Sequence, residues 1–445
     1  MSAIAEVRLW GRSIGAVSWI EERGYAAFEY DVDFSRSGIQ VAPFMMPLPD
    51  SSSRLVQKVY SFAELSRETF NGLPGMLADS LPDKFGNALI DVWLAKQGRK
   101  PVSFNPVERL CYIGARGMGA LEFVPKIGPS ASESESIVIA ELVGLASSIL
   151  NERQQLAVSV STADIHSGLQ DILRVGTSAG GARAKAVIAW NPETNEVRSG
   201  QVDVDQGFEY WLLKFDGVSG NSDKEFNDPT GYGAIEYAYY LMARAAGINM
   251  SESRLLEENG RRHFMTRRFD RISVNGKLEK RHMQTLGALC HYDFNLAGAY
   301  SYEQAMQVIR RIGLPMMSVE QQFRRMAFNI IARNQDDHVK NIAFLMDKRG
   351  QWTLSPAYDM TYNYNPAGAW TGQHQMSMNG KRDDFSLQDF IDCGSAISLQ
   401  RGRAKSIVQE VAEVVRHWPD FAQQAGIDEQ WCARIGASHR LAMAD

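Results

Sequence analysis

The chain has 445 residues, of which 44% are hydrophobic and 22% are charged. Domains usually hold about 100–200 residues, so the chain is too long for a single ordinary domain. We therefore expect two or three packed units. The formal net charge of −5 disfavours a protein whose main task is to bind nucleic acid directly, since such proteins are usually basic.

The cysteines and the apolar runs exclude further classes of protein. The four cysteines are far apart and form no C-x-x-C pair, which argues against a zinc site or a disulfide scaffold. The first residues lack a basic segment followed by an apolar run, as a signal peptide would have. No window approaches the roughly 18 apolar residues of a membrane span. We therefore expect a soluble, cytoplasmic protein that makes no contact with a membrane.

The first third of the chain predicts a small sheet followed by helices. Short apolar runs split by glycines within residues 5–30 are typical of a β-meander. Apolar residues then recur at helical spacing between residues 85 and 94, and we expect Ser80 to cap that helix. Residues 129–136, with the sequence PSASESES, are small, polar and acidic, which favours a linker.

The rest of the chain predicts a mixed middle and a helical end. In the middle we expect helices at 137–152 and 232–246, strands at 186–190, 196–203 and 209–215, and a hairpin turning at Asn275-Gly276. After about residue 284 we expect helices at 302–313, 318–333, 386–393, 400–417 and 427–442, and a hairpin at 342–354. This order indicates an α+β, protein-kinase-like fold with two lobes. The predicted units are an N-terminal α/β accessory domain at 1–130, a small β-rich lobe at 137–283 and a helical lobe at 284–445.

The strongest chemical signal is the spacing D-x-x-x-x-N, from Asp336 to Asn341. This is the spacing of the kinase catalytic loop, in which a carboxylate orients the substrate hydroxyl and a neutral amide holds a metal ion. The spacing alone is weak, because Asp and Asn are common loop residues. His338 and Lys340 lie inside the loop and are expected to support it. Lys340 could also neutralise a transferred phosphoryl group.

The residues after this loop strengthen the prediction. A hairpin at 342–354 is followed by Tyr358-Asp359, and kinases use this order to place their main metal-binding carboxylate. Mg²⁺ favours one or two carboxylates together with phosphate oxygens and water. We therefore expect Asn341 and Asp359 to bind Mg²⁺. A metal hydrolase is the less favoured alternative for His338, because no second ligand stands at a suitable spacing.

Upstream residues predict contacts with ATP. Lys214 ends an apolar run and Glu236 lies in the next predicted helix, an arrangement typical of the kinase lysine and its helix glutamate. The alternative for Lys214 is an exposed residue at the end of a strand. The glycine-rich stretch 176–185 could let backbone N–H groups approach phosphate, although alone it favours a flexible turn. Residues 267–271 stand where a hinge would bind adenine through its backbone, or they form a solvated hairpin face.

Together these motifs resemble the HipA family of toxin-type serine/threonine kinases. The stretch from Ser178 to Lys185 looks like the family's Ser-x-x-Gly-x-x-x-Lys phosphate loop, and Arg268 to Arg271 looks like its Arg-Phe-Asp-Arg segment. Asp336 to Asn341 looks like its Asp-Gly-His-x-Lys-Asn loop, and Tyr358-Asp359 looks like its metal motif. The N-terminal strands, Leu81-Pro82-Asp83 and Gly119-Ala120-Leu121 resemble its N-terminal domain, so the likeness covers most of the chain.

The resemblance implies an ATP- and Mg²⁺-dependent kinase of protein serine or threonine, whose family substrates are aminoacyl-tRNA synthetases. It also implies a small helix-turn-helix antitoxin as partner, through which alone the chain would approach DNA. Ser178 matches the family's autophosphorylated serine. The expected ATP-binding residues are Gly180, Gly181, Ala182, Arg183, Ala184, Lys185, Lys214, Arg267, Arg268, Phe269 and Tyr358.

Two departures and two alternatives stay open. Asp337 stands where the family often has glycine, which adds a carboxylate beside the expected base, and Arg267 stands where an acidic residue often precedes the motif. One alternative function is a small-molecule kinase, since such enzymes use similar loops. The other is a nucleotide-binding corepressor that acts with an antitoxin-like partner.

Overall fold

The computed structural model describes residues 3–48, 58–128, 137–151, 172–173, 176, 183–201, 207–218, 222–223, 226–227, 231–274 and 277–444. Three expected features lie outside these residues. They are the phosphate loop from Ser178 to Ala182, the linker at 129–136 and the turn at Asn275-Gly276.

The predicted N-terminal meander is confirmed and forms part of a five-stranded antiparallel sheet. The strand order is β4 (Val59–Tyr60), β3 (Tyr25–Tyr30), β2 (Arg12–Ile20), β1 (Ile4–Leu9) and β5 (Leu121–Val124). Around it lie the helices α1 (Val32–Ser35), α2 (Arg67–Phe70), α3 (Gly75–Ala78), α4 (Lys84–Lys96), α5 (Pro106–Ile113) and a 3₁₀ turn at Pro101–Ser103. The expected Ser80 cap of α4 is wrong. Asp83 caps this helix, because its side chain accepts a hydrogen bond from the backbone N–H of Gly86.

A second five-stranded sheet forms the small lobe. Its order is β11 (Ser253–Glu258), β12 (Arg261–Arg267), β8 (Glu209–Lys214), β6 (Lys185–Trp190) and β7 (Val197–Ser199). The helices of this region are α6 (Ile139–Asn151) and α9 (Tyr232–Ala245), as predicted, and its short ribbons pair β9 (Ser222–Asp223) with β10 (Phe226–Asn227) and β13 (Arg271–Val274) with β14 (Lys277–Lys280). Lys185 and Lys214 stand directly opposite each other in the β6–β8 register. Opposed residues of an antiparallel pair share a face, so both lysines belong to one side of the sheet.

The C-terminal part is helical, as predicted, around one small sheet. Its helices are α10 (Leu286–Cys290), α11 (Tyr302–Arg311), α12 (Met316–Ile331), α13 (Leu387–Ala396), α14 (Arg403–Arg416), α15 (Trp418–Gln424) and α16 (Glu429–Ser438), with 3₁₀ turns at Val339–Asn341 and Leu441–Ala444. The expected hairpin is β16 (Ala343–Met346) with β17 (Trp352–Leu354), and β15 (His282–Thr285) pairs with β16. No helix of the described residues has both the length and the apolar character that a membrane crossing needs.

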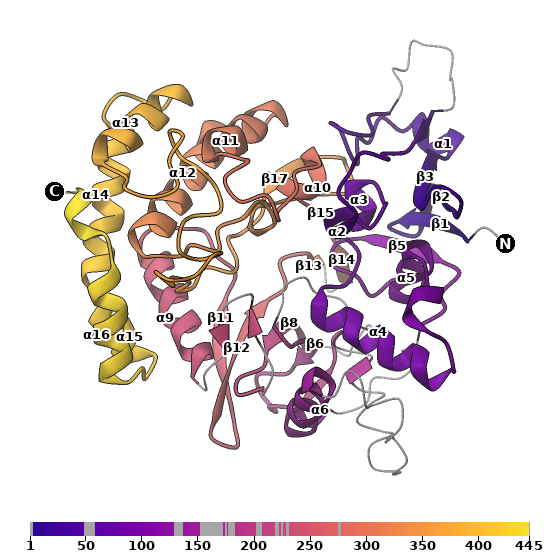
Figure 1. Ribbon diagram of the computed structural model, residues 1–445, viewed down its shortest axis with the longest axis horizontal. Coiled ribbons are helices and arrows are strands. Elements are labelled where there is room, and N and C mark those ends of the chain that lie inside the picture. The colour runs from indigo at the N-terminus through magenta and orange to yellow at the C-terminus, as the bar shows by residue number, and fades with distance from the viewer. Residues whose placement is uncertain are drawn as a thin grey trace.

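The hydrophobic cores cross the predicted unit boundaries. Phe85 and Leu89 of α4 pack in one cluster with α6 and with the inner residues of β6 and β8. Figure 1 shows α4 and α6 lying side by side. Met346 of β16 is buried in the core of the N-terminal sheet. Tyr239 and its neighbours on α9 are buried among α11, α12 and α14 rather than in the small-lobe core. The division at 130, 137 and 284 stays a prediction, while these shared cores join the segments into one packed body.

Two histidines, the buried His282 and the half-buried His291, lie between the N-terminal region and the rest of the chain. The amide of Gln284 contacts His282 Nε2 at 2.8 Å and also donates to Val41 O. His291 Nε2 accepts a hydrogen bond of 3.0 Å from the backbone N–H of Gly75. Burial lowers the pKa of both imidazoles to about 4 from an ordinary 6.5, so both are neutral in the folded protein.

We predict that this junction loses stability in acid. Between pH 6.5 and about 4 the unfolded chain binds protons that the folded chain excludes, so the free energy of unfolding falls as the pH falls. Each histidine contributes up to about 1.4 kcal/mol per pH unit in that window. Urea denaturation between pH 7 and pH 5 should give a shallower pH slope for His291→Asn than for the wild type. The exposed control His417→Asn should keep the wild-type slope, and equal slopes for all three proteins would contradict the prediction.

Candidate active site

The predicted catalytic loop follows α12 and is pinned beside the segment that carries Asp359. Arg333, just past the end of α12, has a positive φ of 60°, which turns the chain out of the helix. Asn363 then exchanges backbone hydrogen bonds with this turn, from Gln335 N to Asn363 O at 3.0 Å and from Asn363 N to Arg333 O at 3.1 Å. The Asn341 amide donates to Asp336 O at 2.8 Å and closes the loop. The D-x-x-x-x-N spacing therefore corresponds to one compact turn.

Lys214 joins three elements at the centre of the candidate site. Its ammonium lies 2.5 Å from Glu236 Oε1 on α9 and 2.5 Å from Asp359 Oδ1. Burial alone would lower the pKa of Lys214, but the two carboxylates outweigh burial and raise that pKa above its ordinary value. Burial would likewise raise the pKa of Asp359, while Lys214 and then Lys185 lower it to about 2. Lys214 and Asp359 are therefore both charged at neutral pH.

Asp359 is held in a backbone conformation that non-glycine residues rarely adopt. Its φ is +52°, in the left-handed region, which costs about 1–2 kcal/mol. The Asn334 amide donates to Asp359 O at 3.3 Å and to Asn329 Oδ1 at 3.0 Å. The Asn334 side chain of the loop thus holds the backbone of Asp359 in its strained conformation. Backbone strain of this kind is commonly found at functional sites. The sequence analysis assigned no role to Asn334.

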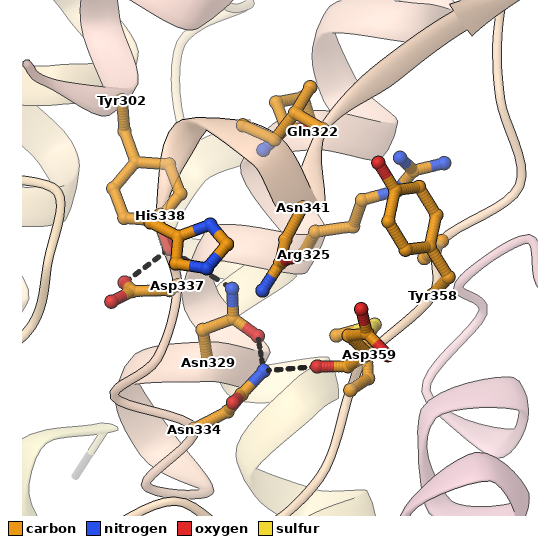
Figure 2. Close-up of a pocket in the computed structure, with 13 residues that line it drawn as sticks. Tyr302, Gln322, Arg325, Asn329, Asn334, Asp337, His338, Asn341, Tyr358 and Asp359 are labelled. Carbon is orange, nitrogen blue, oxygen red and sulfur yellow. Dashed lines mark hydrogen bonds between the residues drawn. The ribbon is translucent and has the colours of Figure 1, made fainter. Parts of the chain in front are cut away.

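Asn341 and Asp359 line one pocket of about 330 Å³ with Asn334 and His338 (Figure 2). The Asn341 N–H₂ group is used on Asp336 O, which leaves the amide oxygen as the metal-type donor. One amide oxygen and one carboxylate are ligands that Mg²⁺ accepts when phosphate and water complete its shell. The donor set therefore fits magnesium. Among the described residues no group of three or more His, Cys, Asp or Glu is placed to hold a metal ion.

Asp336 and His338 are neighbours, and a third residue joins them. His338 Nε2 lies 3.9 Å from Asp336 Oδ1. The indole Nε1 of Trp370 donates to the same oxygen at 2.6 Å. Trp370 was missed by the sequence analysis, because it lies 34 residues after Asp336 in a loop without a recognisable motif.

Asp337 is turned away from the expected base and into the protein. It is 3% exposed and accepts hydrogen bonds from Tyr302 OH at 2.5 Å and from Gln375 N at 2.7 Å. His374 Nδ1 lies 2.8 Å from Asp337 Oδ2, the oxygen that also accepts from Tyr302. Burial would raise the pKa of Asp337, but His374 and these donors lower it. The Asp337 carboxylate, expected beside the base, is thus a buried acceptor that holds Tyr302, His374 and Gln375 in place.

The described end of the phosphate loop meets the N-terminal region. Lys185 Nζ lies 3.5 Å from Asp83 Oδ2, and both side chains are buried. Burial raises the pKa of Asp83 to about 6, and Lys185 offsets part of that rise. Ala184 is buried in the small-lobe core, and the Arg183 guanidinium lies 3.7 Å from the centre of the Tyr232 ring. The sequence analysis quoted Asp83 as part of the resemblance but gave it no role.

Lys340 and Tyr358 lie together on another side of the loop. Tyr358 OH donates to Lys340 O at 2.5 Å, and the Tyr358 ring lies 5.7 Å from the ring of Phe269. The Lys340 ammonium lies over the Phe294 ring at 4.7 Å and lines a pocket of about 220 Å³ with Asp79. The Lys340 ammonium therefore lies against the Phe294 ring and lines this second pocket.

The Arg-Phe-Asp-Arg segment makes a buried ion cluster with the N-terminal region. Asp270 Oδ2 accepts hydrogen bonds of 2.7 Å from Arg268 Nη2, from Arg271 Nη1 and from the backbone N–H of Gly119. Burial would raise the pKa of Asp270, but the two guanidiniums hold it well below its usual range. The backbone N–H of Arg268, a candidate adenine contact, donates to Tyr210 O at 2.9 Å. Arg267 is exposed and lies 3.2 Å from Glu209.

The sheet lobe, the bridging α9, the D-x-x-x-x-N loop and the later Asp359 define a protein-kinase-like fold. The chain belongs to the HipA family. Residues 177–418 match the model of the HipA-like C-terminal domain, and residues 5–124 match that of the HipA N-terminal domain.

Three individual proteins are similar to this chain. A Sinorhizobium fredii protein named "Putative kinase Y4mE" is 26% identical over 201 residues, which span 41% of this chain and 46% of that protein. A HipA chain from Shewanella oneidensis, solved with HipB and operator DNA, has a TM-score of 0.68 at 17% identity and covers 99% of this chain and 96% of its own. A Helicobacter pylori proinflammatory kinase, CtkA, has a TM-score of 0.35 at 11% identity, covering 60% of this chain and 91% of its own. The Shewanella match establishes the fold over nearly the whole chain.

We predict that Asp270→Asn strongly destabilises the protein. The substitution leaves the buried Arg268 and Arg271 without their shared counter-charge, which should cost about 3–5 kcal/mol in the free energy of unfolding. Urea denaturation measures that loss. Asp33→Asn is the matched control, because Asp33 is 81% exposed and its partner Arg36, at 3.5 Å, is 62% exposed, so no measurable change is expected. Similar losses in the two variants would refute the assignment.

Proposed function

We propose that this chain is an ATP- and Mg²⁺-dependent kinase that phosphorylates serine or threonine hydroxyls of a protein. One observation carries the proposal: Lys214 meets Glu236 and Asp359 beside the loop from Asp336 to Asn341. A lysine paired with a helix glutamate, next to a metal-type carboxylate, is the constellation that protein kinases need for phosphoryl transfer. Membership of the HipA family and the Shewanella match support it.

Each residue has a separate part in the proposed reaction. Lys214 and Lys185 bind the ATP phosphates, and the hinge backbone at Phe269 holds the adenine, because the N–H groups of Arg267 and Arg268 already donate to Glu252 O and Tyr210 O. Asn341 and Asp359 hold Mg²⁺, which neutralises charge on the phosphates when bound. Asp336 orients the hydroxyl and accepts its proton, with His338 beside it.

The partners follow from the family and stay proposals. We propose an aminoacyl-tRNA synthetase or another translation component as substrate, and a small helix-turn-helix antitoxin as partner. The Shewanella structure supports the partner, because it is a complex of HipA with HipB and operator DNA. Contact with DNA would then be indirect, in keeping with the net charge of −5.

Ser178, outside the described residues, is the proposed autophosphorylation site. Phosphate there would add about two negative charges beside those of ATP and would switch the enzyme off.

The first experiment is a phosphorylation assay with Mg²⁺, γ-labelled ATP and a cell extract, followed by mass spectrometry of every labelled site. We expect label on Ser178 and on a serine or threonine of an extract protein. Asp336→Asn should reduce that label at least about a hundred-fold, because general-base catalysis contributes about 10²–10⁴. Asp347→Asn is the control, since Asp347 lies in the β16–β17 turn and asparagine keeps its acceptor oxygen for Arg349 N.

The assay also separates the alternatives. Loss of all label in Asp336→Asn, with ATP still bound, supports the proposed base. Asp336-dependent ATP consumption without protein label would favour a small-molecule kinase. ATP binding without any Asp336-dependent turnover would favour the corepressor that acts with an antitoxin-like partner.

We also predict that Lys214→Ala weakens ATP binding at least about ten-fold, since one lost contact between charged groups costs about 1.5–3 kcal/mol. Calorimetric titration with ATP and Mg²⁺ measures this change. Lys348→Ala is the matched control, because Lys348 is a half-exposed turn lysine whose ion pair with Glu279 is 3.3 Å long. Equal ATP affinity in wild type and Lys214→Ala would remove Lys214 from the site.

A further inference from the structure

Trp370 makes a direct contact with the proposed base. Its indole Nε1 donates a hydrogen bond of 2.6 Å to Asp336 Oδ1, and its side chain is half-buried. An indole N–H is only a donor, so it can bind a carboxylate without competing for the proton that the carboxylate accepts. The geometry is thus compatible with a base that is held in place while it works.

The segment that presents Trp370 is closed upon itself. Gly368 N donates to Asn365 O at 2.9 Å, and Asn365 N donates to Thr371 O at 3.3 Å. Gly372 is required here, because a side-chain Cβ would come within 2.4 Å of Gly368 O. Thr371, beside Trp370, is 5% exposed. We call residues 365–372 the tryptophan loop.

Two residues tie the tryptophan loop to the catalytic loop on both sides of Asp336. The Gln375 side chain donates to Trp370 O at 2.5 Å and to Gln335 O at 3.3 Å. Asp337 accepts from the Gln375 backbone N–H at 2.7 Å and contacts His374 at 2.8 Å. Gln375 and His374 are both buried. The short segment from Trp370 to Gln375 therefore contacts Gln335, Asp337 and the Asp336 carboxylate.

We propose that Trp370 is a positioning residue for the catalytic base, and that Asp337 and Gln375 hold the tryptophan loop so that the indole N–H fixes the Asp336 carboxylate. This inference deepens the proposed function and rests on it. It also gives Asp337 a purpose: the carboxylate that stands where the family often has glycine anchors a loop that touches the base.

The physical effect follows from orientation. A carboxylate that turns freely spends little time aimed at the substrate hydroxyl, and a misplacement of about 1 Å can cost about a hundred-fold in rate. A charged hydrogen bond to one oxygen stops that rotation. This effect acts on the chemical step and leaves ATP binding unchanged.

The test separates turnover from binding in Trp370→Phe, which keeps a ring and removes the N–H. We expect kcat to fall about ten- to a hundred-fold, with the KM for ATP changed less than about two-fold. Trp431→Phe is the matched control, because Trp431 is a half-buried tryptophan on α16 and should keep both constants. An unchanged kcat in Trp370→Phe overturns the proposal. A raised kcat also overturns it, because the indole would then block the base.

A second variant tests the tether without touching the base. Gln375→Met removes the side-chain donor to Trp370 O. This variant should lower kcat, as Trp370→Phe does. The double variant Trp370→Phe with Gln375→Met should be no slower than the slower single variant, because both changes act through one loop. Fully additive losses would show that Gln375 acts by another route, and they would overturn its part in the proposal.

A spectroscopic measurement keeps this inference apart from the proposed function. The chain has nine tryptophans, and the indole ¹⁵N–¹H signal of Trp370 is identified by its loss in Trp370→Phe. In Asp336→Ala that signal should move, because its acceptor is gone, whether or not the protein turns over ATP. A signal that does not respond overturns the contact. A signal that responds in a protein without Asp336-dependent phosphorylation refutes the proposed function instead.

Discussion

The buried ammonium of Lys214 is the interaction on which the arrangement of the site depends. Taking one charge out of water costs several kcal/mol, and only close opposite charges offset that cost. Glu236 and Asp359 supply them at 2.5 Å each. Since Lys214 ends β8, Glu236 lies in α9 and Asp359 follows β17, one cation fixes the sheet of the small lobe, the bridging helix and the strained metal-type residue relative to one another.

The N-terminal region takes part in the same body rather than standing beside it. Helix α4 shares its core with α6 and the small-lobe sheet, and Asp83 at its start lies beside Lys185. The Asp270 cluster receives the backbone of Gly119 at the same junction. The N-terminal region therefore contributes the Asp83 carboxylate to the proposed nucleotide site. The ion cluster of Asp270 joins the same region to the residues that follow β12.

Periodicity and motif order predicted most of the fold. The meander, α9, the catalytic hairpin and the main C-terminal helices lie where their apolar spacing placed them, because these elements bury one face each. The Lys214–Glu236 contact was also predictable from chain order. Trp370 was missed, since it reaches the site only through tertiary packing and lies in no motif. Asp83 belonged to a motif of the resemblance, but its contact with Lys185 depends on tertiary packing that the motif does not reveal. Asp337 was interpreted as a second carboxylate beside the base, whereas its partners Tyr302 and Gln375 come from distant segments that no local pattern reveals.

The shared cores have a consequence for synthesis on the ribosome. The N-terminal sheet emerges first, yet its core is completed by Met346, and Trp352 Nε1 donates to Gln40 O across 312 residues of sequence. The apolar face of α4 likewise waits for α6, β6 and β8. A nascent chain therefore carries exposed hydrophobic surface until most of its length has been translated. We therefore expect translational pauses and truncated products within that interval to leave aggregation-prone chains that need chaperones. The N-terminal region alone is not expected to fold stably.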